Sequence, residues 1–278
     1  MATTKITSAA GLRRVQAFKL DVNGVPSDDE SGANGYDGIQ VSGAQSFQIN
    51  APDAQIIPFL GDDVLFAQMF LPPTTGVSAT LNTQKNDMDA LALFTNTSVE
   101  TINSDIQMAG NYTSNQGNEQ DVALLITRNA LDTDNTSTKF GSQRWQTYIV
   151  NKGNVFPKGA SIEQNAAEVD AYNVVMTPTS VPPWQKSFTN ATNGYTTAQY
   201  LVLTSEYPIT MEKYTGNGTL TTFNTTFTPV SVAKTAVFVN GTIATVSSVD
   251  TGASTFTLSS APAASANVVA LVQTSDNI

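Results

Sequence analysis

Three pairs of neighbouring carboxylates have the residue types and spacing that could support chemistry: Asp62 with Asp63, Asp87 with Asp89, and Asp132 with Asp134. Paired carboxylates can bind a divalent cation or serve as acid and base in glycoside hydrolysis. The second pair falls in the first turn of a predicted helix, where acids suit the positive end of the helix dipole. The third pair lies in a polar stretch that lacks the Gly-x5-Glu continuation of a calcium loop. We therefore expect neither a metal nor a cofactor at these positions.

One segment matches a catalytic signature. Ser247 to Ser254 contains Asp250-Thr-Gly-Ala-Ser, the pattern of aspartic proteases, whose chemistry needs two carboxylates that share one proton. No second copy of the pattern exists, because Asp132-Thr is followed by Asp and not by Gly. Only 24 residues follow Ser254, too few to complete a retroviral-type subunit. We therefore predict a hairpin turn between strands 245–249 and 255–258, and no protease.

Residue types that most enzymes depend on are absent. The chain has no His, the commonest general base near neutral pH, and no Cys, so thiolate chemistry and disulfides are excluded. No glycine loop followed by Lys and Ser or Thr occurs, which removes the usual phosphate-binding motif. We expect a non-enzymatic protein and assign no catalytic, cofactor-binding or metal-binding residue.

The charge balance limits the class of partner. The formal net charge is −10, and no basic residue occurs between Lys19 and Lys85. Affinity for the phosphate backbone comes from Lys and Arg, so specific nucleic-acid binding is not expected, although DNA could pass such a surface without adhering. The acidity also has a simpler interpretation, which is that it keeps the protein soluble.

The predicted secondary structure is mainly β. One helix is predicted near 86–95, with Asn86 as its cap and Met88, Leu91, Ala92 and Thr95 on one face. The loop from Asp21 to Gly38 contains two Asn-Gly pairs and few bulky apolar residues, so we expect an exposed arm. The strands are predicted at 12–20, 39–49, 54–60, 64–71, 98–108, 121–128, 142–150, 169–177 and 198–206. This pattern predicts a β-sandwich or barrel with one flanking helix.

A change in composition near Thr215 predicts a second, small Ig-like β-sandwich. After this point only Lys234, Asp250 and Asp276 are charged. The Asn240-Gly241 pair between two apolar runs indicates a two-residue hairpin. The strands of this domain are predicted at 219–227, 236–239, 242–248, 255–259 and 268–273. The predicted organisation is a first domain at 1–208, a linker at 209–217 and a C-terminal domain at 218–278.

Seven segments between residues 12 and 206 occur in a characteristic order: 41–47, 50–52, 61–63, 87–94, 122–126, 144–149 and 168–176. Their order resembles that of the major tail, or tail tube, proteins of long-tailed bacteriophages. Residues 215–278 resemble a β-domain common on phage structural proteins, through Gly-x-Gly-Thr-x-Thr-Thr-Phe, Val-x-Val-Asn-Gly and Thr-x-Thr-Leu-x-x-Ala-Pro-Ala.

The resemblance implies a virion structural protein whose copies form rings, six to a ring, that stack into the conduit for DNA ejection. Its partners would be further copies of itself and the tape measure, tail terminator and distal tail proteins. DNA would pass through the lumen unbound, arms such as 21–38 would tie rings together, and the C-terminal domain would make weak contacts with cell-surface glycans. The resemblance places the protein in the virion tail, and in the host cytoplasm during assembly.

Two other classes of function stay open from the sequence. The chain could be another virion part, such as a capsid decoration or connector protein. It could also be a carbohydrate-binding module or a glycan-cleaving enzyme. The first 14 residues lack the apolar run of a signal peptide, and no stretch approaches the roughly 20 apolar residues of a membrane span, so no membrane partner is expected.

Overall fold

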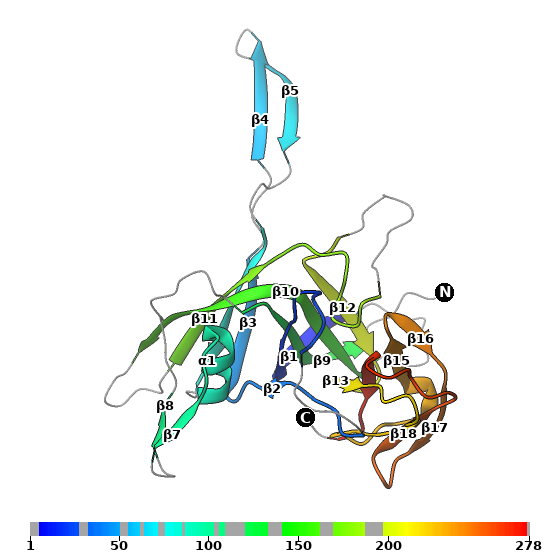
Figure 1. Cartoon of the computed structure of the whole chain (residues 1–278). Coiled ribbons are helices and arrows are strands. Elements are labelled where there is room, and N and C mark those ends of the chain that lie inside the picture. The colour runs from blue at the N-terminus through cyan, green and yellow to red at the C-terminus, as the bar shows by residue number, and fades with distance from the viewer. Residues whose placement is uncertain are drawn as a thin grey trace.

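The structure is a computed structural model that describes residues 6–27, 33–50, 55–61, 64–71, 76–84, 87–102, 106–108, 120–132, 141–161, 169–186 and 197–276. Within these ranges the chain is mainly β with a single α-helix, which confirms the predicted fold class. Figure 1 shows a larger sheet with the helix at its side and a smaller group of strands near the C-terminus.

The larger sheet has the strand order β2-β1-β9-β10-β11-β6-β3, with β12 paired to β10. Its strands are β1 (Ile6–Lys19), β2 (Ile39–Gln40), β3 (Ala44–Asn50), β6 (Ser78–Thr83), β9 (Val122–Asp132), β10 (Gln143–Ser161), β11 (Val169–Met176) and β12 (Tyr200–Ser205). The first half of β10 pairs with β9 and β12, and its second half pairs with β11. The sheet therefore folds over into two layers that share β10.

Gly153 lies where β10 passes from one layer to the other. A Cβ atom at this position would lie 2.7 Å from the backbone oxygen of Val175 on β11, closer than a side chain tolerates. The register between β10 and β9 also shifts between Val150 and Gly153. Glycine is thus required where the two strands approach most closely.

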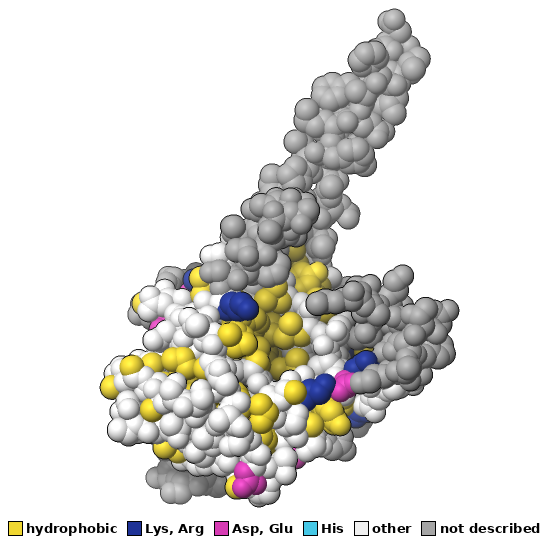
Figure 2. All heavy atoms as spheres, turned by 90° about the vertical axis from the view of Figure 1, so that its right-hand side faces the viewer, with side chains coloured by type: hydrophobic (Ala, Val, Ile, Leu, Met, Phe, Trp, Pro, Cys, Tyr) yellow, Lys and Arg dark blue, Asp and Glu magenta, His cyan; other side chains and the backbone are white. Residues whose placement is uncertain are grey.

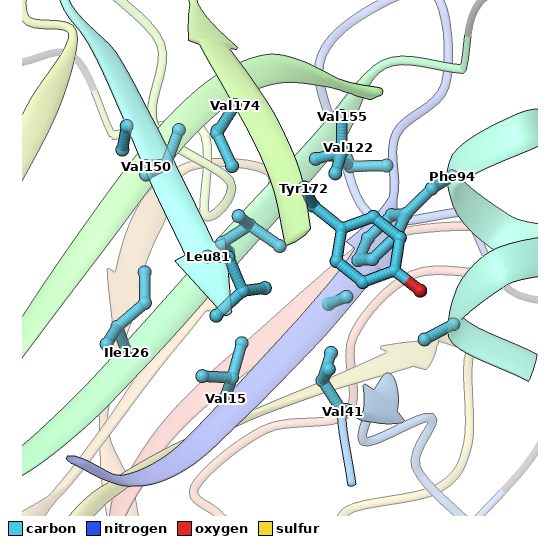
Figure 3. Close-up of a cluster of buried hydrophobic side chains, with 14 of the residues drawn as sticks. Val15, Val41, Leu81, Phe94, Val122, Ile126, Val150, Val155, Tyr172 and Val174 are labelled. Carbon is cyan, nitrogen blue, oxygen red and sulfur yellow. The ribbon is translucent and has the colours of Figure 1, made fainter. Parts of the chain in front are cut away.

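The two layers enclose an apolar core, shown in Figure 3. Alternate residues of β9 face inward there, because successive side chains of a strand point to opposite faces. Val122, Leu124 and Ile126 accordingly belong to this core, while Ala123 and Leu125 face the other side of the sheet.

Helix α1 (Met88–Thr95) covers one end of this core. Its N-cap is Asp87, whose carboxylate accepts a hydrogen bond from the Ala90 amide; the predicted cap, Asn86, lies outside the described residues. The buried residues are Ala90, Ala92, Leu93 and Phe94, and Leu91 is half-buried against the same core. The predicted face is therefore right at Leu91 and Ala92, but it omits Ala90, Leu93 and Phe94. The ring of Phe94 packs edge-on against Tyr172 of β11, with centroids 5.2 Å apart. Phe94, the largest apolar side chain of α1, therefore determines which face of the helix is turned toward the core.

The C-terminal part forms a small β-sandwich. One sheet contains β13 (Ile209–Thr215), β19 (Asn267–Gln273), β15 (Thr235–Val239) and β16 (Thr242–Ala244), in that order. The other contains β14 (Thr222–Asn224), β18 (Thr255–Leu258) and β17 (Val246–Asp250), and a 3-10 turn, η1 (Val232–Lys234), precedes β15. Tyr214, Phe223 and Phe256 form a mutual aromatic cluster between the two sheets.

The linker predicted at 209–217 is instead mostly a strand, because residues 209–215 form β13 and its first six residues are buried. Met211 of β13 packs on the outer face of the larger sheet, against a group that includes Phe18, Leu125 and Ile149. The two parts of the chain thus share an apolar core and are not joined by an exposed connector.

The arm predicted at 21–38 is also corrected where the chain is described. Val25 is only 4% exposed, and Leu20 forms a β-bridge with Pro26. Tyr36 exchanges two backbone hydrogen bonds of 2.8 Å with Lys213 at the open edge of β13, and Asn34 forms a β-bridge with Asn224, so this segment lies against the sandwich. The segment packs down because Tyr36 can bury its ring edge-on against Phe18.

A different segment projects from the body. The hairpin of β4 (Gln55–Gly61) and β5 (Val64–Leu71), cyan in Figure 1, stands well away from the other strands. A second hairpin, β7 (Glu100–Ile102) with β8 (Ile106–Met108), replaces the single strand predicted at 98–108. The strand predicted at 39–49 is likewise divided into β2 and β3 by a turn at Gly43, where φ is +69°.

Candidate functional site

The Asp250 motif is a turn, as predicted. One oxygen of the Asp250 carboxylate accepts hydrogen bonds from the backbone amides of Gly252 and Ala253, at 2.9 and 3.0 Å. The residues on either side form β17 and β18, which pair as a hairpin. The carboxylate is therefore used to hold the turn, which accounts for its position without any catalytic role.

The paired acids are placed in different surroundings. Asp87 caps α1 and also accepts a hydrogen bond of 2.8 Å from the Ser42 amide, so it ties the helix to the turn before β3. Asp89 lies in the first helical turn. Asp62, Asp63 and Asp134 lie outside the described residues, as does the side chain of Asp132. No group of three or more potential metal ligands occurs in the parts of the chain that are described.

The least expected group is a carboxylate inside the C-terminal sandwich. Glu212 of β13 is fully buried, and its carboxylate accepts a hydrogen bond of 2.6 Å from the Tyr214 hydroxyl. It also accepts the Thr226 amide at 3.1 Å. Burial raises the pKa of Glu212 to about 7, although the hydrogen bonds from Tyr214 and from the Thr226 and Phe227 backbones oppose this rise.

The hydrogen bonds of Tyr214 fit a protonated Glu212. The phenol lies 2.9 Å from the backbone oxygen of Asn224 as well as 2.6 Å from the carboxylate, but it has only one hydrogen to donate. A protonated carboxyl group could donate to the phenol oxygen, which would leave the phenol hydrogen for Asn224. Burial also raises the pKa of Tyr214 well above its usual value, so this phenol stays protonated.

A polar layer joins this sandwich to the larger sheet. The Gln16 side chain, 1% exposed, donates to the Asp37 backbone oxygen at 2.7 Å and accepts from the Met211 amide at 3.4 Å. Beside it, the Arg14 guanidinium lies 4.0 Å from the centre of the Phe227 ring, and its Nε donates to Gln40. Burial lowers the pKa of Arg14 to about 10, and the charges of Asp37 and Glu212 oppose that fall, so it stays cationic near neutral pH.

Apart from the two-residue β2, which pairs only with β1, two strands of the larger sheet offer unpaired edges. β12 pairs only with β10, and β3 pairs only with β6, so within the described ranges the outer edge of each strand has no strand partner. Val202 of β12 is 43% exposed and Leu131 of the nearby β9 is also 43% exposed. Figure 2 views the side of the molecule where β12 lies and shows apolar side chains gathered across its middle with few charged groups. Such an edge can pair with another chain.

Two clefts lie away from the edges of β12 and β3. The larger, about 780 Å³, lies between β2 and α1 and is lined by a mixture of polar and apolar residues that includes Lys19, Asp89, Tyr36 and Leu93. The smaller, about 350 Å³, lies where the loop 21–27 meets the C-terminal sandwich, and its lining is almost entirely polar.

The burial of Glu212 was not predicted from the sequence. One signal could have revealed it: the run Ile-Thr-Met-Glu-Lys-Tyr at 209–214 carries apolar side chains at 209 and 211, at alternate positions. Alternation of this kind is typical of a strand and not of a linker.

No protein-family model matches this chain, and no curated protein matches it. No helix in the described part of the chain is long and apolar enough to cross a membrane.

Proposed function

We propose that this chain is a self-assembling structural subunit, the tail tube protein of a long-tailed bacteriophage. The observation that supports the proposal is the pair of open strand edges at β12 and β3, at two separate places on one folded-over sheet. An exposed edge promotes indefinite association unless a neighbour covers it in a closed arrangement. Contacts between different surfaces of identical copies close into rings when the rotation allows it.

The projecting hairpin supports a second contact, between rings. β4 and β5 contain seven and eight residues, which corresponds to a reach of roughly 25 Å. A two-stranded hairpin is marginally stable by itself in water and gains from packing against another surface. In the proposed assembly this hairpin serves as the arm between rings, in place of residues 21–38, to which the resemblance assigned that role.

In the proposed assembly, the chain lies in the virion tail, and its partners are its own copies together with the tape measure, terminator and distal tail proteins. The net charge of −10 supports a lumen through which DNA slides without binding, because like charges oppose adhesion. The C-terminal sandwich lies outside the tube wall in this arrangement.

Negative-stain microscopy and light scattering of the purified chain test the proposal. The wild type is expected to form rings or tubes, and Val202→Lys is expected to prevent them, because a lysine on an edge strand blocks edge pairing. Val175→Lys is the matched control, since Val175 is 40% exposed but lies on β11, which is paired on both sides. A wild type that stays monomeric at high concentration would contradict the proposal. Trimers that bind capsids would favour a decoration or connector protein instead.

The polar cleft of 350 Å³ favours a second candidate, a carbohydrate-binding module. Hydroxyl and amide groups of this kind recognise sugar hydroxyls through paired donors and acceptors. Binding of glycans by a chain that never polymerises would favour this alternative over the tube.

A further inference from the structure

The smaller cleft, which we call the seam cleft, is built from both parts of the chain. Its lining consists of the loop residues Asp21, Asn23, Val25, Pro26 and Ser27, together with Gln185, Lys213, Asn240, Ser265 and Asn267. Only Val25 and Pro26 among these are apolar. A volume of about 350 Å³ falls at the small end of the range for small-molecule sites.

The backbone around the seam cleft adopts uncommon conformations. Five non-glycine residues in the described ranges have positive φ, and three of them line this cleft: Gln185 at 61°, Asn240 at 48° and Ser265 at 63°. Asn240 is explained by its Asn-Gly hairpin turn, which requires positive φ. Gln185 and Ser265 are not explained in this way, because turns normally place Gly or Asn at such positions. Strained non-glycine residues of this kind cluster at ligand sites.

Asn267, which lines the cleft, carries a buried acceptor that has no partner. Its backbone amide donates to the Asn240 side chain at 2.8 Å, and its Nδ2 donates to the Gln185 side chain at 3.3 Å. Its Oδ1 atom is buried and has no hydrogen-bond partner. A buried carbonyl oxygen without a donor costs free energy, so a small rotation of Asn267 that brings this oxygen to a ligand hydroxyl in the cleft would be favoured.

The charges of the cleft are already engaged. The Asp21 carboxylate accepts the amides of Asn23 and Val25, and the Lys213 ammonium donates to the Tyr214 backbone oxygen and to Thr215. The lining therefore carries one negative and one positive side chain, whose charges cancel. The groups available to a ligand are therefore neutral amides and hydroxyls. Each can both donate and accept hydrogen bonds, which matches the donors and acceptors of neighbouring hydroxyl groups on a sugar.

We propose that the seam cleft binds a neutral polyhydroxylated ligand, a monosaccharide or the end of a short oligosaccharide. The inference extends the proposed function, since rings would display many copies of one weak site, but the site itself is complete in a single chain. No aromatic ring lies among the residues that line the cleft, so binding of a single sugar is expected to be weak.

Saturation-transfer NMR of the full-length protein with methyl glucoside, methyl galactoside, N-acetylglucosamine and rhamnose tests this proposal. At least one sugar is expected to show transfer, and Ser265→Gly is expected to weaken its binding about tenfold through loss of a ligand hydrogen bond. The same variant should melt at a higher temperature, because glycine relieves the strain at positive φ. A residue with only a structural role would not lower binding while raising stability.

Ser254→Gly is the matched control. Ser254 is also a serine at positive φ, 51°, in the same sandwich, but it lies in the β17–β18 turn and not in the seam cleft. It should keep full sugar binding. Equal loss in both variants, transfer to none of the four sugars, or binding of glycerol phosphate alone would each overturn the assignment. Micrographs of the same samples separate the two proposals: tubes without sugar binding contradict only the cleft, and binding without tubes contradicts only assembly.

Discussion

The carboxyl group of Glu212 and the hydroxyl group of Tyr214 lie 2.6 Å apart on the inner face of one strand, β13, and both side chains are fully buried. A carboxyl group in this position is more easily accommodated neutral than charged. The stability of the C-terminal sandwich is therefore linked to pH.

The sign of this linkage follows from the raised pKa. Between pH 4.5, the ordinary value, and about 7, the folded protein holds a proton on Glu212 that the unfolded chain has released. The stability contributed by that proton is complete below pH 4.5 and is lost as pH rises through 7. Glu212→Gln should therefore exceed the wild type in unfolding free energy above pH 7, by about 3 kcal/mol, and match it near pH 4.5.

Chemical denaturation of both proteins across pH 4 to 8.5 measures this difference. Tyr214→Phe provides a second check, because the lost hydrogen bond normally lowers the pKa of Glu212, so the pH at which stability falls should move upward. A constant difference between wild type and Glu212→Gln at all pH values would show that Glu212 is not titrating in this range.

Gly35→Ala tests whether residues 33–37 must lie against the sandwich. A Cβ atom at Gly35 would lie 2.6 Å from two ring carbons of Tyr214, which is itself packed on two phenylalanine rings and cannot retreat. We expect a loss of about 1–3 kcal/mol from overpacking, and faster proteolysis of the 21–38 loop. Gly252→Ala, where the nearest atom is 3.4 Å away, should change stability little. Equal thermal shifts in the two variants would argue against a fixed loop.

Met211→Ala tests the shared core between the two parts of the chain. Met211 is fully buried against the outer face of the larger sheet, so truncation should cost about 2–5 kcal/mol. Calorimetry should also show one unfolding transition for the wild type, since neither part can expose this face freely. Ile243→Ala, at a side chain 63% exposed, should have an effect below about 0.5 kcal/mol. Two independent transitions in the wild type would contradict a common core.

Asp250 variants separate turn formation from catalysis. Asp250→Ala removes the acceptor for two backbone amides and should lower stability by about 1 kcal/mol, whereas Asp250→Asn keeps an acceptor oxygen and should change it less. Casein incubated with wild type at acidic pH should stay intact. If the wild type cleaved casein and Asp250→Asn did not, the aspartic protease interpretation would be supported instead.

The extent to which sequence predicted this fold depended on the kind of residue. β5 and the Asn240-Gly241 hairpin could be placed because apolar runs end at Gly, Pro or Asn-Gly signals that act locally. β6 was missed because its sequence, Ser-Ala-Thr-Leu-Asn-Thr, has small and polar residues whose burial depends on two neighbouring strands.

The segments 21–38 and 209–217 were misjudged for the same physical reason. Each is polar or short in sequence, and each is fixed by a partner far along the chain. Tyr36 pairs with Lys213, and Met211 bonds Gln16, which is 195 residues away. Local patterns carry no information on such pairing. The raised pKa of Glu212 and the seam cleft follow from those long-range contacts, so neither could be predicted from one sequence.

The sharing of β10 between both layers has a mechanical consequence. A force that shears one layer against the other acts along the continuous backbone of β10. The backbone hydrogen bonds that join β10 to β9, β12 and β11 must break before the layers can slide past each other. A sandwich whose layers were joined only by side-chain contacts would slide at lower load. The subunit is thus expected to resist tension and internal pressure as one stiff body.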